Sequence, residues 1–368
     1  MGEVNIARPI IQAAQSRWPD LAVLLTVSTV SGRDLAQNAL PQIPLTWLPF
    51  DHPACVRPFL RTLDPRALVL LDTELWPCLI SSARRCGVPA IIANGRVSDK
   101  HFPRYRRFKT VFNPALQGLA AAAMQNEEYA ARLVELGAPP ERVLVCGNTK
   151  FDGLRESVDP EKVDALRTQC GFGPDDPVVV FGSTRPGDEA LAAGCWASLR
   201  DLFPNLRLVI APRHLDRLKE AMICFAGPVK TRSEGEGAAH ARVFFLDTVG
   251  ELVDFYAMAT VAVIGGSFSP GVNGHNPLES AALGVPTVFG PYMRNFIDPA
   301  RELVSHNGAI QTTADELAQV LRRLLENPEE RAALAHNGRQ AVRKNQGAIN
   351  RTLDLIEPFV KAASPPLC

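Results

Sequence analysis

The chain has 368 residues, of which 46% are hydrophobic and 21% charged, and its 39 lysines and arginines balance its 39 acidic residues. This length suffices for two domains, and the balance excludes a strongly basic protein drawn to nucleic acid by its overall charge. No apolar run approaches the ~18 residues of a membrane span, no signal-peptide pattern is present, and the cysteines form no C-x-x-C pair. We therefore expect a cytoplasmic globular protein with reduced thiols.

Short apolar runs bounded by glycine, proline or asparagine alternate with amphipathic segments along the whole chain. This pattern is typical of parallel sheets covered by helices. In the first half, the predicted strands span Leu21–Thr29, Ala67–Glu74, Val88–Arg96, Leu119–Asn126 and Val143–Asn148. In the second half, they span Val178–Thr184, Leu206–Arg213, Val243–Thr248, Val261–Ser267 and Val285–Pro291.

The segment Phe151–Asp176 separates the two sets of strands and contains an amphipathic helix near Pro160–Gln169. We therefore place a domain boundary near Gly153 and predict two Rossmann-like, doubly wound α/β domains, 1–153 and 154–368, with helices closing the second. Ligands of such folds bind outside the carboxyl ends of the strands, so the active site is expected in a cleft between the domains.

Four polar or glycine-rich clusters follow predicted strands in the second half of the chain: Val178–Glu189, Leu206–His214, Phe244–Leu252 and Gly265–Ser280. Each alone is also explained by ordinary turn chemistry. Together they favour a nucleotide sugar, because amides at helix N-termini bind phosphate and Glu279 is placed to accept ribose hydroxyls. The P-loop and G-x-G-x-x-G motifs are absent, which argues against an NAD enzyme.

Seven motifs in order resemble the 3-deoxy-D-manno-octulosonic acid (Kdo) transferases over essentially the whole chain. They are GEV, DTELWP, NGRVS, GNTKFD, FGSTRPGDE, APRH and GGSFSPGVNGHNPLESAALGVPTVFGP. The resemblance implies a GT-B type glycosyltransferase of lipopolysaccharide biosynthesis, without cofactor or obligatory metal. It implies transfer of Kdo, with inversion, from CMP-Kdo to a hydroxyl of the lipid A precursor lipid IVA, at the cytoplasmic face of the inner membrane.

The resemblance assigns the role of general base to Glu3, although by position alone Glu3 reads as a first-turn helix glutamate. It also implies two sets of contacts. The CMP-Kdo contacts are Pro212, Arg213, Thr248, Val249, Gly250, Glu251, Asn276 and Glu279. The candidate contacts to the acceptor or to Kdo are Glu74, Arg96, Lys150 and Ser183. For Arg96 and Lys150, a salt bridge at the domain interface is the alternative.

Two pairs of acidic residues raise the question of a metal site. Asp175 and Asp176 precede a strand, on the wrong side of the sheet for the cleft, so we expect a solvated turn there. Asp72 and Glu74 would point to opposite faces of an extended strand, which is poor geometry for one ion. We therefore expect no metal, and interpret Glu74 as shaping the cleft wall or the acceptor site.

Basic and aromatic side chains gather in Asp99–Lys109, against an otherwise balanced chain. This segment could be a solvated helix face, or it could bind nucleic acid or a membrane surface. Given a phosphorylated lipid acceptor, we favour contact with anionic headgroups or with the acceptor itself. Members of the family begin with a hydrophobic anchor and a first strand, whereas this chain begins at Met1, so we expect both to be missing and the protein to be peripheral.

Two other functions remain open at this stage. A nucleotide-sugar epimerase can use the same paired architecture, and it would act on a sugar nucleotide without a lipid acceptor. A truncated homologue could bind nucleotide and perform no chemistry.

Overall fold

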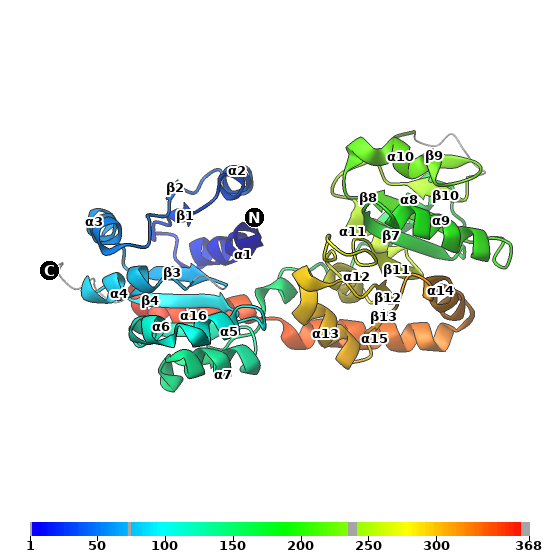
Figure 1. The fold of residues 1–368 in the computed structure, drawn as a ribbon. Helices are drawn as coiled ribbons and strands as arrows, with labels where there is room; N and C mark the ends of the chain where they lie inside the picture. The colour runs from blue at the N-terminus through cyan, green and yellow to red at the C-terminus, as the bar shows by residue number, and fades with distance from the viewer. Residues whose placement is uncertain (1, 73–74, 235–240, 362–368) are drawn as a thin grey trace. The chain divides into compact units, whose positions relative to one another are not determined.

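The computed structural model describes residues 2–72, 75–234 and 241–361, which divide into two compact units (Figure 1). Unit 1 comprises the residues up to Gly153 together with those from Asn345 onward, and unit 2 comprises Leu154–Lys344. Glu74 lies outside the described residues. Within these ranges, no helix is both long enough and apolar enough to cross a lipid bilayer.

Unit 1 contains a four-stranded parallel sheet in the order β3-β4-β5-β6 and a separate two-stranded parallel sheet. The four strands lie within predicted segments, so those predictions are confirmed. In the two-stranded sheet, the first strand lies within the predicted segment Leu21–Thr29, and the second lies in a segment that was not predicted as a strand. The bounds are β1 Leu25–Val27, β2 Leu45–Trp47, β3 Leu68–Leu71, β4 Ala90–Gly95, β5 Leu119–Met124 and β6 Val143–Val145.

Helices cover both faces of the four-stranded sheet, because its side chains alternate between two apolar cores. Ile92 faces the core that holds α4 and α7, whereas Ile91 faces the core that holds α1 and α16. The helices of unit 1 are α1 Gly2–Arg17, α2 Val30–Ala39, α3 Pro53–Leu63, α4 Pro77–Arg85, α5 Phe102–Arg107, α6 Lys109–Leu116, α7 Glu127–Leu136 and α16 Ala348–Lys361.

Unit 2 contains a seven-stranded parallel sheet in the order β13-β12-β11-β7-β8-β10-β9. Five of its strands lie within predicted segments. The two edge strands, β9 and β13, were not predicted. The bounds are β7 Val178–Thr184, β8 Arg207–Pro212, β9 Val229–Thr231, β10 Val243–Phe245, β11 Val261–Ile264, β12 Thr287–Phe289 and β13 Ala309–Gln311.

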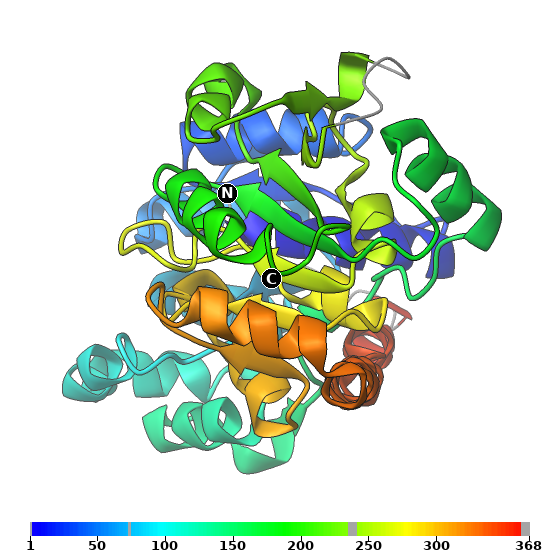
Figure 2. The ribbon, with the colours of Figure 1, turned by 90° about the vertical axis from the view of Figure 1, so that its right-hand side faces the viewer.

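The sheet of unit 2 lies between two layers of helices (Figure 2). On one face, Val179 and Phe181 of β7 share a core with α9 and α14. On the other face, Phe244 of β10 stacks on Phe255 of α11 with ring centroids 5.8 Å apart. The helices are α8 Pro160–Cys170, α9 Asp188–Leu199, α10 Leu218–Ile223, α11 Leu252–Ala257, α12 Leu278–Ala282, α13 Ile297–Ser305, α14 Leu317–Glu326 and α15 Pro328–Asn345.

The last helix belongs to unit 1, which differs from the predicted domain 154–368. Asp152 accepts hydrogen bonds from the amides of Gly347 and Ile349, both 2.6 Å long, at the start of α16. Arg351 donates to the carbonyl of Cys146 over 2.8 Å. The apolar side of α16 then covers β4 and β5, so the chain returns from unit 2 to complete the core of unit 1.

Candidate functional site

The carboxyl ends of β7 and β11 meet at the point where the strand order of unit 2 changes direction. From β7 the sheet continues through β8 on one side and through β11 on the other, and ligands of open α/β sheets bind at such a switch point. The backbones are in close contact here. An added Cβ at Gly265 would lie 2.6 Å from the carbonyl oxygen of Ser183, and Ser183 itself has φ +56°. Only glycine fits at position 265.

The Asp188 carboxylate joins the two loops that leave these strands. One oxygen, Oδ2, accepts from the amide of Arg185 at 2.8 Å and from the amide of Gly266 at 2.6 Å. The other, Oδ1, is buried and has no hydrogen-bond partner in the described ranges. Burial raises the pKa of Asp188 to about 6, and the two amide hydrogen bonds oppose that rise.

Three of the residues predicted to bind the nucleotide come together at this point. Asn276 Nδ2 donates to Glu279 Oε1 at 3.1 Å, and its Oδ1 accepts from the first amide of α12. The positive charge of Arg213 acts on Glu279, whose pKa is nevertheless raised because the carboxyl is buried. Arg213 and Pro212 are positioned by the end of β8, where the Arg213 amide donates to the carbonyl of Thr184 at 3.0 Å.

The structure adds three residues that the sequence reasoning did not include in the site. Arg185 Nε donates to His275 Nε2 at 3.2 Å, and Arg185 Nη1 lies 2.5 Å from His214 Nε2. Burial, together with the cations of Arg185 and Arg213, lowers the pKa of His275 to about 4. All three follow predicted strands, which was the available signal, but nothing in the sequence indicated that they would meet.

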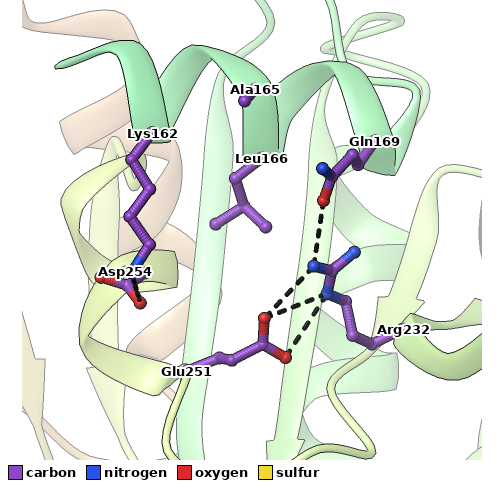
Figure 3. Close-up of a pocket in the computed structure, with 7 residues that line it drawn as sticks. All are labelled: Lys162, Ala165, Leu166, Gln169, Arg232, Glu251 and Asp254. Carbon is purple, nitrogen blue, oxygen red and sulfur yellow. Dashed lines mark hydrogen bonds and ion pairs between the residues drawn. The ribbon is translucent and has the colours of Figure 1, made fainter. Parts of the chain in front are cut away.

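The turn Thr248–Glu251 forms a second group, after β10. Val249 is 88% exposed and Gly250 has φ +94°. Glu251 accepts a hydrogen bond from Thr248 and forms an ion pair with Arg232 at 3.2 Å. Figure 3 shows Arg232 directed at Glu251 and at Gln169, which it reaches over 3.0 Å.

A pocket of about 200 Å³ lies beside this turn, between α8 and α11. The charged side chains that line it are paired with one another. Lys162 contacts Asp254 at 2.7 Å, and Arg232 contacts Glu251 (Figure 3). We therefore interpret the pocket as support for the turn, because its charges are engaged in holding α8 and α11 together.

In unit 1, the Asp72 carboxylate lies among three of the candidate residues. Glu3, Arg96 and Lys150 all act electrostatically on Asp72, which follows β3 in a left-handed backbone conformation, φ +56°. Burial, with a contribution from the negative charge of Glu3, raises its pKa to about 6 against the effect of the two cations. Glu3 itself is exposed in the first turn of α1.

Polar side chains from the other strand ends extend this network. Gln125 Nε2 donates to Asp72 Oδ1 at 3.0 Å, and Asn148 donates to Gln125 at 3.0 Å. Asn94, whose own φ is +54°, accepts through its side chain from the amide of Thr149 at 3.0 Å. The carboxyl ends of β3, β4, β5 and β6 thus converge on Asp72, a residue that the sequence reasoning considered only as a metal ligand.

The acidic pair before β7 is a structural turn. Asp176 accepts from the amide of Gly173 at 2.7 Å and forms an ion pair with Arg207 at 2.8 Å. These contacts lower its pKa. Across residues 2–72, 75–234 and 241–361, no three histidine, cysteine or acidic side chains are grouped as metal ligands.

Comparison with known proteins gives matches over both halves of the chain. Residues 1–153 match the family described as 3-deoxy-D-manno-octulosonic-acid transferase, and residues 212–357 match a family described as glycosyl transferase-like. The 3-deoxy-D-manno-octulosonic acid transferase of Haemophilus influenzae is 30% identical over 371 residues, which cover 98% of this chain and 86% of the relative. The enzyme of the same name from Bordetella pertussis is 32% identical over 375 residues, with the same coverage.

Solved structures share the fold at lower identity. HepE of Anabaena, in complex with UDP, superposes with a TM-score of 0.61 and 16% identity, covering 97% of this chain and 96% of its own. The UDP-GlcNAc 2-epimerase of Neisseria meningitidis, bound to UDP-GlcNAc, superposes with a TM-score of 0.61 and 13% identity, covering 98% of this chain and 97% of its own. These likenesses show the two-domain, GT-B type arrangement of Rossmann-like sheets and confirm the predicted fold class.

We predict that Asp188→Asn changes the pH dependence of stability in unit 2. Because the folded-state pKa of Asp188 is about 6, above the ~3.9 of an exposed aspartate, folding favours its protonated form. Its contribution to stability is therefore largest at low pH and is lost as pH rises through 6, by about 1–3 kcal/mol.

The free energy of unfolding is measured in urea at pH 4.5, 6 and 7.5, with hydrogen exchange in peptides from β7 and β11 as the probe. The stability of the variant relative to the unsubstituted chain should rise as pH increases. An identical pH dependence in both proteins would contradict a raised pKa of Asp188 in the folded state.

Proposed function

The chain belongs to the family of 3-deoxy-D-manno-octulosonic acid (Kdo) transferases, and on that premise we propose that it transfers Kdo from CMP-Kdo to a hydroxyl of lipid IVA. It is a glycosyltransferase. The observation that carries the choice of donor is the convergence of Arg213, Asn276 and Glu279 at the switch point of unit 2. A guanidinium suits the phosphate of a nucleoside monophosphate, and a carboxylate oriented by an amide suits its ribose hydroxyls.

In this proposal, unit 2 binds the donor. Arg213 binds the phosphate of CMP, because a guanidinium matches phosphate oxygens in geometry and charge. Glu279, held by Asn276, accepts hydrogen bonds from the ribose hydroxyls. The Thr248–Glu251 turn, whose Gly250 carries no side chain, offers its backbone to the nucleotide, and Pro212 and Ser183 line the same strand ends.

Unit 1 receives the acceptor and supplies the base. The acceptor hydroxyl attacks the anomeric carbon of Kdo as CMP leaves, and its proton passes to the carboxylate of Glu3. The attack inverts the configuration at that carbon. Arg96 and Lys150, which lie near Glu3 around Asp72, offer positive charge to the acceptor phosphates or to the Kdo carboxylate. Glu74 stays a candidate for the acceptor side.

The decisive experiment measures CMP release from CMP-Kdo with and without lipid IVA. We expect release to require the lipid, because transfer needs the attacking hydroxyl. Conversion of the donor without lipid would instead support an epimerase, whose likeness to this chain extends to the fold alone. Binding of CMP with no turnover under either condition would support a nucleotide-binding homologue without activity.

Substituting the base and a donor ligand should have separable effects. Glu3→Gln should lower kcat by about a hundredfold or more, with CMP affinity unchanged, because general base catalysis is lost and unit 2 is untouched. Arg213→Ala should weaken CMP binding directly. Calorimetry with CMP gives the affinity of both variants, and initial-rate kinetics give their kcat. A parallel loss of affinity in Glu3→Gln would point to a structural role for Glu3.

We place this reaction at the cytoplasmic face of the inner membrane, with α5 and α6 against the lipid. Arg104, Arg107 and Lys109 are exposed there, beside Phe108 and Val111, whose surfaces are 49% and 56% exposed. Basic residues with apolar neighbours suit an anionic interface, because the cations meet headgroups and the apolar groups enter the boundary of the acyl chains.

Replacing Arg104, Arg107 and Lys109 together by glutamine should weaken binding to anionic vesicles by roughly a hundredfold, since each contributes on the order of 1 kcal/mol. Vesicle flotation with phosphatidylglycerol measures this binding. A matched variant with Lys219, Arg322 and Arg323 replaced, all in unit 2, should bind as the unsubstituted chain does. An equal loss of vesicle binding in both triple variants would show that α5 and α6 do not form the membrane-binding face.

A further inference from the structure

We propose that Arg185 is a second oxyanion-binding arginine of the donor site, held in position by His214 and His275. The inference rests on the proposed function, because it concerns the site that would hold CMP-Kdo. The donor carries two anionic groups, a phosphate and a carboxylate, and Arg213 accounts for one cation near them.

Three strand ends bring this cluster together. Arg185 follows β7, His214 follows β8, and His275 lies in the loop between β11 and α12. The guanidinium donates through Nε to His275 at 3.2 Å and lies 2.5 Å from His214 through Nη1. The cluster therefore spans the switch point, where the fold itself favours ligand binding.

The partners of Arg185 differ in kind from those of two other arginines of unit 2. Arg207 pairs with Asp176 and Arg217 with Glu189 and Glu220, so their charges are neutralised by carboxylates. Among the residues that the structure describes, no carboxylate forms an ion pair with the Arg185 guanidinium. Asp188, the carboxylate that acts on it electrostatically, uses one oxygen to bind the Arg185 and Gly266 amides.

Imidazole partners orient a guanidinium without neutralising it. Arginine remains protonated, so the His275 nitrogen that accepts its hydrogen must be unprotonated. Burial and the surrounding cations keep His275 neutral at physiological pH. A carboxylate at this place would compete with a bound anion for the same charge, whereas a neutral imidazole leaves that charge available.

The remaining donors of Arg185 suit an oxyanion. A guanidinium has five N–H groups in one plane and binds phosphate or carboxylate through two parallel hydrogen bonds. Two of these directions are used by the imidazoles. Arg213 acts electrostatically on the same His275, so both arginines contribute positive potential at this cluster.

The first experiment compares CMP, cytidine and CMP-Kdo as ligands of Arg185→Gln. If Arg185 binds the phosphate, the Kd for CMP should rise about tenfold or more and that for cytidine should not change. If it binds the carboxylate, the Kd for CMP should stay constant and the KM for CMP-Kdo should rise by a similar factor. Either result supports the proposal. Values within twofold of the unsubstituted chain for both ligands overturn it.

Two controls separate this effect from general ones. Lys219→Gln removes an exposed charge from the same unit and should alter neither CMP affinity nor KM. Arg213→Ala reports on the proposed function itself. If the unsubstituted chain binds neither CMP nor CMP-Kdo, the proposed function fails and takes this inference with it. If Arg213→Ala weakens CMP binding and Arg185→Gln changes neither constant, only this inference fails.

The positioning role of His275 has its own test. His275→Leu removes the acceptor and should reproduce the effect of Arg185→Gln, whereas His275→Gln retains an acceptor oxygen and should restore most of the affinity. In the Arg185→Gln background, His275→Leu should have no further effect on ligand binding. An equal effect of His275→Leu with and without Arg185 would show that His275 acts by another route and overturn the positioning role.

Discussion

The hydrogen bonds that the Asp188 carboxylate accepts from the amides of Arg185 and Gly266 are the constraint on which the candidate donor site depends. They connect the loops after β7 and β11, two neighbouring strands whose carboxyl ends form the switch point of unit 2. Burying a carboxylate is unfavourable, and the raised pKa of Asp188 reports that penalty. The fold retains it because two backbone amides at a loop junction need an acceptor.

Unit 1 uses a comparable device. Asp72 stands at the end of β3, where Gln125 and the backbone of Arg96 meet it. Asp152, farther along, binds the first amides of α16 and so brings the end of the chain onto this unit. Asp188 and Asp152 each accept two backbone amides through the carboxylate. The Asp72 carboxylate accepts the side-chain amide of Gln125, and its backbone carbonyl accepts the Arg96 amide. The candidate base Glu3 is exposed but lies close enough to act electrostatically on Asp72, as Arg96 and Lys150 do.

The parts of the fold that could be predicted are those with long, uninterrupted apolar signals. β7 and β8 are buried on both faces, so their sequences are continuous apolar runs that end at polar clusters. β2, β9 and β13 have three residues each and include a polar one, so they show neither a period nor a continuous apolar run, whereas the equally short β6 is apolar throughout. The amphipathic pattern of α16 indicates that one side is buried but not which sheet covers it, so its assignment to unit 1 required the contacts of Asp152 and Arg351.

The candidate site, too, has parts that the sequence predicted and parts that only the tertiary structure decided. From the sequence alone came the family resemblance, the strand end that carries Arg213, the helix start that carries Glu279, and the glycines of the loop after β11. These are local features of residue type and order. The tertiary structure decided that Arg185 lies between His214 and His275 and that Asp72 lies near Glu3, Arg96 and Lys150. Such contacts join side chains that the sheet order brings together, and the order in which strands pair is not written in any one segment.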